Sequence, residues 1–232
     1  MVPAAFLERA AVPEGGGSPR RTFQAVSPST GEPAGPRIEV STVHEAQAAA
    51  MASWAAYHAM LEMDAADRAA LLEGMAEAIG RLGEALVKQA SAETGLSAVR
   101  IVAERERLTQ TLRMFADLVR SRRLDRPSVD TAEPSRRPLP KPDLRRMRRG
   151  VGPVAVFGPA NQPLTGGALG ADAASALAAG CPIICKSHPE HPLTDAMVAH
   201  AAREACVALG GPEGLVTLLH ADEAGRRPWR VR

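Results

Sequence analysis

The sequence contains few aromatic residues: four Phe, two Trp and one Tyr make up 3% of its 232 residues. Hydrophobic residues nonetheless account for 45%, so a packed core would be built mainly from Ala, Val, Leu, Ile and Met. A chain of this length holds one large domain or two small ones. The scarcity of aromatic rings argues against a nucleic-acid surface that depends on stacking with bases.

Cysteine is also scarce, and its spacing excludes the common zinc motifs. The three cysteines are Cys181, Cys185 and Cys206, with no CxxC pair and no histidine at a ligand spacing. We therefore predict no metal site and a reducing, cytoplasmic location. The first residues have no basic segment followed by a long apolar run, so we expect no signal peptide. No apolar stretch reaches the roughly 18 residues that span a bilayer, so we expect no membrane partner.

A large excess of charge of one sign is missing as well, since the net charge is +2. The exception is a connector predicted at residues 121–150, which has five prolines and ten Lys or Arg against four acids. Prolines there break helices and favour extended structure. Nucleic-acid binding through Arg145–Arg149 is one interpretation, but a basic run in a proline-rich connector is more often a solvated surface. We therefore predict no nucleic-acid partner.

Residues 1–20 are predicted to form a flexible arm, because Pro13–Pro19 is rich in glycine and proline. A short strand is expected at Phe23–Pro28, followed by a turn at Ser29–Glu32.

Residues 21–120 are predicted to form a helical region. Thr42 and Glu45 fit a capping box that opens a helix ending near Leu61. Apolar residues then recur at three- and four-residue spacing, which indicates amphipathic helices packed on one another. These positions are Leu71, Leu72, Met75, Ile79, Leu82, Leu86, Val87, Ala90, Ile101, Leu108, Leu112, Phe115 and Val119, with Gly95 between the last two helices.

Residues 151–220 show a βαβαβ pattern. Short apolar runs at 154–157, 182–185 and 215–219 indicate buried strands. Helices are expected at about 163–179 and 193–209, each followed by glycine. Right-handed crossovers would make this sheet parallel.

Two polar residues follow neighbouring strands of the predicted sheet. Asn161 lies in the loop after the first strand, and Lys186 ends the second. Ligands bind beyond the carboxyl ends of strands in open parallel sheets. There an Asn amide can donate to a developing oxyanion, and a Lys can donate to ribose hydroxyls. Each residue also has a simpler interpretation, as a helix-capping Asn and a solvated Lys, and the GxGxxG dinucleotide fingerprint is absent.

Several segments together resemble the aldehyde dehydrogenase superfamily, over about residues 22–220. The segments are FQAVSPSTGE, ALVKQASAETGLSAVRIVAERERLTQTLRMFADLVR, GPVAVFGPANQPL and DAASALAAGCPIICKSHPEHPLT. SRRPLPKPDLRRM and the KSHPEHP run are most similar to its 2-oxoglutarate semialdehyde (2,5-dioxovalerate) dehydrogenase branch. The resemblance implies an α/β fold: an N-terminal helical region plus an incomplete Rossmann-like parallel βαβαβ sheet, with residues 151–220 as a partial NAD(P)-binding domain.

The resemblance also implies roles for individual residues. Asn161 matches the oxyanion-hole Asn, and Lys186 matches the Lys that holds the adenosine ribose of NAD or NADP. Phe157, Gly158 and Pro159 match backbone beside the cofactor, and the substrate would be a small-molecule aldehyde.

The ribose site departs from the family pattern at one position. Pro189 stands where many NAD-preferring members place a Glu against the ribose diol. His188 is expected to add positive charge beside it. NADP tolerance is therefore expected.

In this family a catalytic Cys and a general-base Glu lie downstream of the third strand, and neither is present here. Residues 221–232 do not continue the family pattern, so we expect a truncated chain that is inactive alone. Cys185 falls inside a strand and Cys181 just after a glycine, and both are expected to be inert packing thiols. The alternative is a non-catalytic binding or regulatory module that pairs with a full-length relative. A homo-oligomer is also compatible with the sequence.

Overall fold

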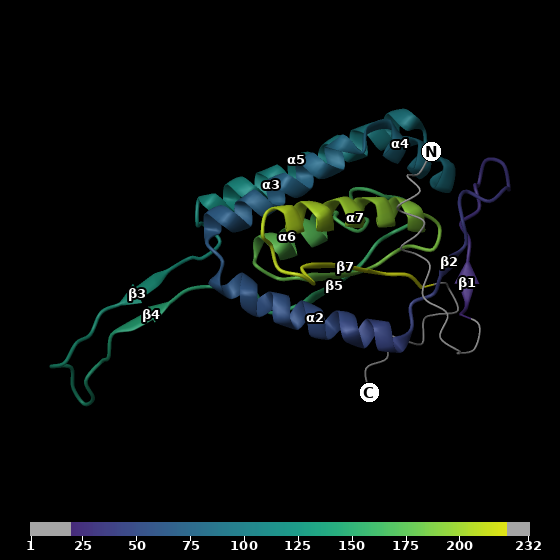
Figure 1. Ribbon diagram of the computed structural model, residues 1–232. Helices are drawn as coiled ribbons and strands as arrows, with labels where there is room; N and C mark the ends of the chain where they lie inside the picture. Colours follow the sequence, from purple (N-terminus) through teal and green to yellow (C-terminus); the bar gives the residue numbers. More distant parts are fainter. Residues whose placement is uncertain (1–19, 222–232) are drawn as a thin grey trace.

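The computed structural model describes residues 20–221 of the chain. It has a parallel sheet with helices on both faces and a long hairpin that extends away from the body (Figure 1). The predicted arm at residues 1–20 and the predicted tail at 221–232 lie outside the described residues, apart from Arg20 and Ala221.

The sheet confirms the predicted parallel arrangement. Strands β5 (Val154–Phe157), β6 (Ile183–Lys186) and β7 (Val216–Leu219) lie side by side in that order. Their last residues are level, because Phe157 pairs with Lys186 and Lys186 with Leu219. All three strands therefore end at one edge, which we call the carboxyl edge. It comprises these three residues and the turns that follow them at 158–170, 187–191 and 220–221.

Helices cover both faces of this sheet. α6 (Ala171–Ala178) and α7 (Pro192–Ala208) lie over one face, and α2 (Val43–Glu62) contacts β6 and β7 from the other (Figure 1). Thr42 opens α2 with the predicted capping box: its hydroxyl accepts from the Glu45 N–H at 3.1 Å, and its own N–H donates to the Glu45 carboxylate at 2.7 Å.

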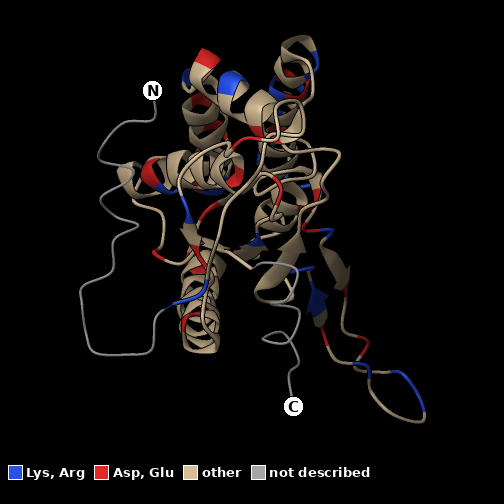
Figure 2. Ribbon diagram, turned by 90° about the vertical axis from the view of Figure 1, so that its right-hand side faces the viewer, with Lys and Arg blue, Asp and Glu red and all other residues tan. Residues whose placement is uncertain are grey.

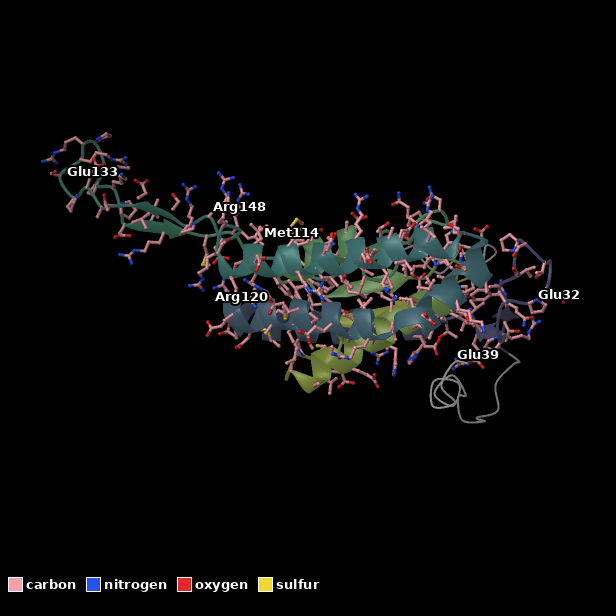
Figure 3. The ribbon with its side chains drawn as sticks, turned by 90° about the horizontal axis from the view of Figure 1, so that it is seen from above. Glu32, Glu39, Met114, Arg120, Glu133 and Arg148 are labelled. Atoms are coloured by element: carbon pink, nitrogen blue, oxygen red, sulfur yellow. The ribbon has the colours of Figure 1, made fainter. Side chains whose placement is uncertain are left out.

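A second layer of helices packs outside α6 and α7. α3 (Ala65–Arg81) lies against α5 (Ala98–Arg120) and α7, and α4 (Gly83–Thr94) contacts α5 and α7. Figure 3 shows α3 and α5 side by side, with Arg120 near the end of α5, where it pairs with Glu73 of α3. The predicted apolar stripes form the core between these layers; Leu82 and Phe115 are partly buried at its margin.

The helix predicted at 163–179 is wrong in its first half. Residues 158–170 form a series of turns, and α6 begins only at Ala171. Pro163 and the small residues after it suggest a helix start, but the chain folds back closely on itself here, and a Cβ on Gly167 or Gly170 would collide with the carbonyl oxygen of Pro163 or Thr165.

The connector at 121–150 contains paired structure that the proline pattern did not predict. β3 (Ser128–Asp130) and β4 (Leu144–Arg146) form an antiparallel hairpin whose loop carries basic residues (Figure 2). Near the N-terminus, β1 (Thr22–Phe23) pairs with β2 (Ile38–Glu39).

The strand predicted at Phe23–Pro28 is shorter than expected. The chain leaves it to turn at Ser27, whose N–H donates to the Glu32 carbonyl at 2.8 Å. The turn predicted at Ser29–Glu32 therefore begins two residues earlier.

No helix within residues 20–221 combines the length and the apolar character that crossing a membrane requires.

Candidate functional site

The carboxyl edge brings the two turns that carry Asn161 and Lys186 onto neighbouring strands. Lys186 is half-buried and level with Phe157, which is 58% exposed and lies four residues before Asn161. Gly158 and Pro159 begin the turn that leads from Phe157 to Asn161. The structure therefore places all the predicted site residues at this edge, with His188 in the turn after Lys186.

Asn161 itself is exposed, but its turn is held firmly by α5. Arg100 donates from Nη2 to the Asn161 carbonyl at 2.8 Å and from Nε to Glu104 at 3.1 Å. Glu104 is 8% exposed and accepts from the backbone N–H groups of Leu164 and Thr165 at 3.2 and 3.4 Å. These bonds fix the backbone at Asn161 and at the third and fourth residues after it.

Arg100 and Glu104 were missed by the motif analysis. A signal was present, because Glu104 falls between Ile101 and Leu108 at three- and four-residue spacing, on the apolar face of its helix. A carboxylate in such a position needs buried donors to stabilise its charge.

The same turn packs tightly on the start of α7. A Cβ placed on Gly167 would collide with the Pro163 carbonyl oxygen and lie 2.7 Å from Asp195 Oδ1. The next residue, Ala168, donates its N–H to that oxygen at 3.0 Å. Gly167 is therefore required by a close approach of two backbone segments and a buried carboxylate.

The turn after Lys186 is anchored by Asp195, which is 1% exposed. Its Oδ2 accepts from the His188 N–H at 3.1 Å and lies 3.3 Å from His191 Nδ1. His191 is fully buried, and its Nε2 is 3.0 Å from the Pro159 carbonyl oxygen. His191 and Asp195 were also missed, although their four-residue spacing at the start of a helix places them on one face.

His188 corrects one expectation. Burial first, and then the positive charge of His191, lower the pKa of His188 below its usual range, so its ring is neutral at neutral pH. It therefore adds no positive charge there. The Glu190 N–H donates to His188 Nδ1 at 3.3 Å, which leaves the ring proton on Nε2 as a neutral donor.

A second histidine is neutral at the same edge. Ser187 Oγ and His220 Nδ1 are 2.7 Å apart, and burial lowers the pKa of His220 to about 4. The backbone of His220 is tied to Ser41 by bonds of 2.8 and 2.9 Å. This pair connects the ends of β6 and β7 to the segment before α2.

The three cysteines are buried, as expected for packing thiols. Cys185 Sγ donates to the Ala168 carbonyl at 2.8 Å. Burial, followed by the negative charge of Asp195, raises the pKa of Cys185 far above its usual range, and burial raises that of Cys206 to about 11. Cys185 and Cys206 are therefore not set up as thiolate nucleophiles, and Cys181 is buried as well.

Two cavities of the molecule, of about 330 and 550 Å³, have linings that include none of the predicted site residues. Within residues 20–221, the structure groups no three His, Cys, Asp or Glu side chains in a way that would hold a metal ion.

Comparison with known proteins gives a consistent result. Residues 16–227 match the sequence model of the aldehyde dehydrogenase family. The alpha-ketoglutaric semialdehyde dehydrogenase 2 of Azospirillum brasilense is 44% identical over 199 residues, which are 85% of this chain and 38% of that protein. The alpha-ketoglutaric semialdehyde dehydrogenase of Acinetobacter baylyi is 37% identical over 204 residues, which are 88% of this chain and 39% of that protein. The chain thus spans about two fifths of the length of these relatives.

A solved structure gives the same picture of the fold. The glyceraldehyde-3-phosphate dehydrogenase of Methanocaldococcus jannaschii, complexed with NADP, superposes with a TM-score of 0.72 at 21% identity. The match covers 88% of this chain and 42% of that one.

Proposed function

The chain belongs to the aldehyde dehydrogenase family, and from this membership we propose that its carboxyl edge binds NAD or NADP for the oxidation of an aldehyde to a carboxylic acid. The observation that carries the proposal is the level register of Phe157 and Lys186, which sets a half-buried lysine beside the turn of Asn161. The substrate proposed from the names of the relatives is 2-oxoglutarate semialdehyde.

The residues at this edge fit a dinucleotide. Lys186 supplies an ammonium group with three donors for the ribose hydroxyls. Phe157, 58% exposed at the adjacent strand end, offers apolar surface next to it. When bound, the dinucleotide supplies the acceptor for the hydride that leaves the substrate carbon.

Asn161 would act on the substrate carbonyl. Its exposed amide would donate to the oxygen that gains negative charge when the carbonyl is attacked. The bonds from Arg100 and Glu104 fix the turn in advance, so the donor needs little reorganisation during the reaction.

The ribose site would accept both NAD and NADP. Pro189 has no carboxylate to repel a 2′-phosphate, and His188 offers a neutral N–H donor from Nε2. Glu190 is exposed, with its carboxylate 3.9 Å from His188 Nδ1, so a strong preference for NADP is not expected either.

We further propose that the chain does not oxidise aldehydes by itself, because each of its three cysteines is buried. The same observation favours the second candidate function, a non-catalytic module that pairs with a longer relative.

The test combines a binding titration with an activity assay on the 232-residue chain. We expect NAD and NADP to bind with dissociation constants within about tenfold of each other, and His188→Ala to weaken NADP more than NAD. We expect no reduced dinucleotide to form from 2-oxoglutarate semialdehyde. Absence of binding to either dinucleotide would refute the proposed function, and turnover by the chain alone would refute its inactivity.

A further inference from the structure

We propose that His191 is a positioning residue: as an imidazolium held between the Pro159 carbonyl and the Asp195 carboxylate, it joins the oxyanion turn to the cofactor turn. The oxyanion turn is residues 158–161, and the cofactor turn is residues 187–191. We call the set of Pro159, His191 and Asp195 the His191 bridge. Its meaning for catalysis rests on the proposed function, but its existence does not.

The two neighbours of the ring determine its protonation. Nε2 is 3.0 Å from the Pro159 carbonyl oxygen, and Nδ1 is 3.3 Å from Asp195 Oδ2. Both neighbours are acceptors, and a neutral imidazole has only one N–H to donate. A neutral ring that donates from Nε2 to Pro159 would turn its Nδ1 lone pair towards the Asp195 carboxylate. An imidazolium keeps the bond to Pro159 and places positive charge beside that carboxylate, with Nδ1 in ion-pair contact but without a hydrogen bond of normal geometry.

Asp195 extends the bridge to a third segment. Its Oδ1 accepts from the Ala168 N–H at 3.0 Å, and its Oδ2 accepts from the His188 N–H at 3.1 Å. One buried carboxylate therefore contacts the turns that follow β5 and β6 as well as His191. Since His191 reaches Pro159 from there, the residues proposed for catalysis and for cofactor binding share one charged centre.

The other charged groups around the ring come from three elements. Glu93 of α4 lies at the start of α7, where its carboxylate accepts from the Leu193 and Thr194 N–H groups at 2.9 and 2.8 Å. In the cofactor turn, the His188 ring stacks on His191 with centroids 5.3 Å apart, beside Lys186 and Glu190. His220 follows β7, and the charges of Asp195 and Lys186 act on its pKa in opposite directions.

Their combined effect favours the charged ring. Burial alone opposes it, but the hydrogen bond and charge of Asp195, the Pro159 carbonyl and the charge of Glu93 outweigh burial and raise the pKa of His191 to about 9. The bridge is therefore intact at neutral pH. As the pH rises through about 9 the ring loses its charge and one N–H, so it can keep only one of its two contacts, which weakens the link between the oxyanion turn and the cofactor turn.

His200 provides a matched control on the same helix. It pairs with Glu204 at 3.1 Å with the same four-residue spacing as His191 and Asp195, but its side chain is 39% exposed. His200→Gln therefore removes a pair of the same spacing from a more exposed position further along α7.

The first experiment compares the wild type with Asp195→Asn. Side-chain NMR of the histidines across about pH 6 to about pH 10 reports the protonation of each ring directly. We expect His191 to remain doubly protonated at neutral pH and to titrate above about pH 8, and Asp195→Asn to lower that midpoint by more than one pH unit. A wild-type His191 that is neutral at pH 7, or a midpoint unmoved in Asp195→Asn, would overturn the bridge.

The second experiment measures whether the bridge holds the turns. Amide hydrogen exchange at residues 158–168 should become at least about tenfold faster in His191→Gln and Asp195→Asn, while α3 and α5 keep their protection. His200→Gln should leave the exchange unchanged. Equal exchange in all four proteins would contradict the positioning role. If His191→Gln loses protection throughout the molecule, the role is tested instead by the exchange of Asp195→Asn and by the titration of His191 in the wild type.

Dinucleotide affinity separates this inference from the proposed function. If NAD binds, we expect its affinity to fall between about pH 7 and about pH 10 in the wild type but to be flat in His191→Gln. If NAD does not bind while His191 titrates as described, the proposed function fails and the bridge remains. A flat wild-type profile with intact binding contradicts the link between the bridge and the site.

Discussion

Glu104 supports the oxyanion turn from the segment that follows it. Its carboxylate reaches from α5 to the backbone N–H groups of Leu164 and Thr165 and also pairs with Arg100, which binds the Asn161 carbonyl. Asn161 is exposed and contributes only this backbone contact to the network. The side chain proposed for chemistry and the side chain that positions it are thus different residues on different elements.

We predict that Glu104→Ala lowers the free energy of unfolding by about 1–3 kcal/mol, because two N–H groups lose their acceptor and Arg100 its partner. The partial exposure of Arg100 keeps the loss below that of a fully buried pair. Urea unfolding provides the measurement. Glu106→Ala, which removes an exposed acid from the same helix, is the control and should change stability by less than about 0.5 kcal/mol. A loss no larger than that of Glu106→Ala would show that the turn does not depend on Glu104.

At the scale of the element, the start of α7 depends on a carboxylate from α4, a neighbouring helix that is about 100 residues away in the sequence. It begins at Pro192 without a side-chain cap from its own N-cap residue, His191. Glu93 of α4 supplies the acceptor instead, for the N–H groups of Leu193 and Thr194 and for the Thr194 hydroxyl at 2.6 Å. A negative charge at a helix N-terminus is also favoured by the helix dipole.

We therefore predict that Glu93→Ala costs about 2–4 kcal/mol of unfolding free energy, since it leaves buried donors at the start of α7 unsatisfied. Glu93→Gln should cost less, because one amide oxygen remains as an acceptor. Hydrogen exchange along the first turn of α7 should rise with the loss of stability. Glu84→Ala in α4 serves as the matched exposed control, and equal stability of the two alanine variants would disprove the capping role.

Local pattern explains which elements could be predicted. The three strands were predictable because each is a short apolar run, and α3 because its apolar residues recur at three- and four-residue spacing; both signals lie within one segment. The start of α6 was not, because Pro163 and the glycines fit both a helix start and a tight turn. What decides between these is contact with Glu104 and Asp195, which belong to other helices.

The candidate site shows the same division. Asn161 and Lys186 were found because strand ends are predictable from sequence. Glu93, Arg100, Glu104 and His191 were not, since they act on residues that are tens to a hundred positions away. The neutral state of His188 likewise depends on the charge of His191 and on burial, and neither can be derived from its neighbours in sequence.

At the scale of the whole molecule, the carboxyl edge contains two buried histidines with different protonation states. His191 is buried beside the Asp195 carboxylate and is charged, while His220 is buried with the Ser187 hydroxyl on its Nδ1 and stays neutral. The β3–β4 hairpin lies far from this edge, at the other end of the molecule (Figure 1). The pH dependence of stability should therefore report mainly on the edge.

We predict a stability maximum near pH 6.5. The folded pKa of His191 lies above its ordinary value of 6.5, so its contribution is fully present below pH 6.5 and is lost as the pH rises through about 9. His220 has a lowered pKa, so stability falls as the pH drops from 6.5 through about 4 and the unfolded chain binds the extra proton. Each change corresponds to about 3 kcal/mol.

Urea unfolding at several pH values measures this profile. His191→Gln should flatten the alkaline side only, and His220→Gln the acidic side only. A profile that is flat on both sides in the wild type would show that neither histidine carries the protonation state described above.

The central claim is that the carboxyl edge is a dinucleotide site with Lys186 as one of its donors. The most direct measurement is the affinity of the 232-residue chain for NAD, compared between the wild type, Lys186→Ala and Lys88→Ala, which removes an exposed lysine from α4. A charged hydrogen bond to the ribose predicts that Lys186→Ala raises the dissociation constant roughly tenfold to a hundredfold while Lys88→Ala leaves it unchanged. Equal affinity in all three proteins, or no binding in the wild type, would contradict the account.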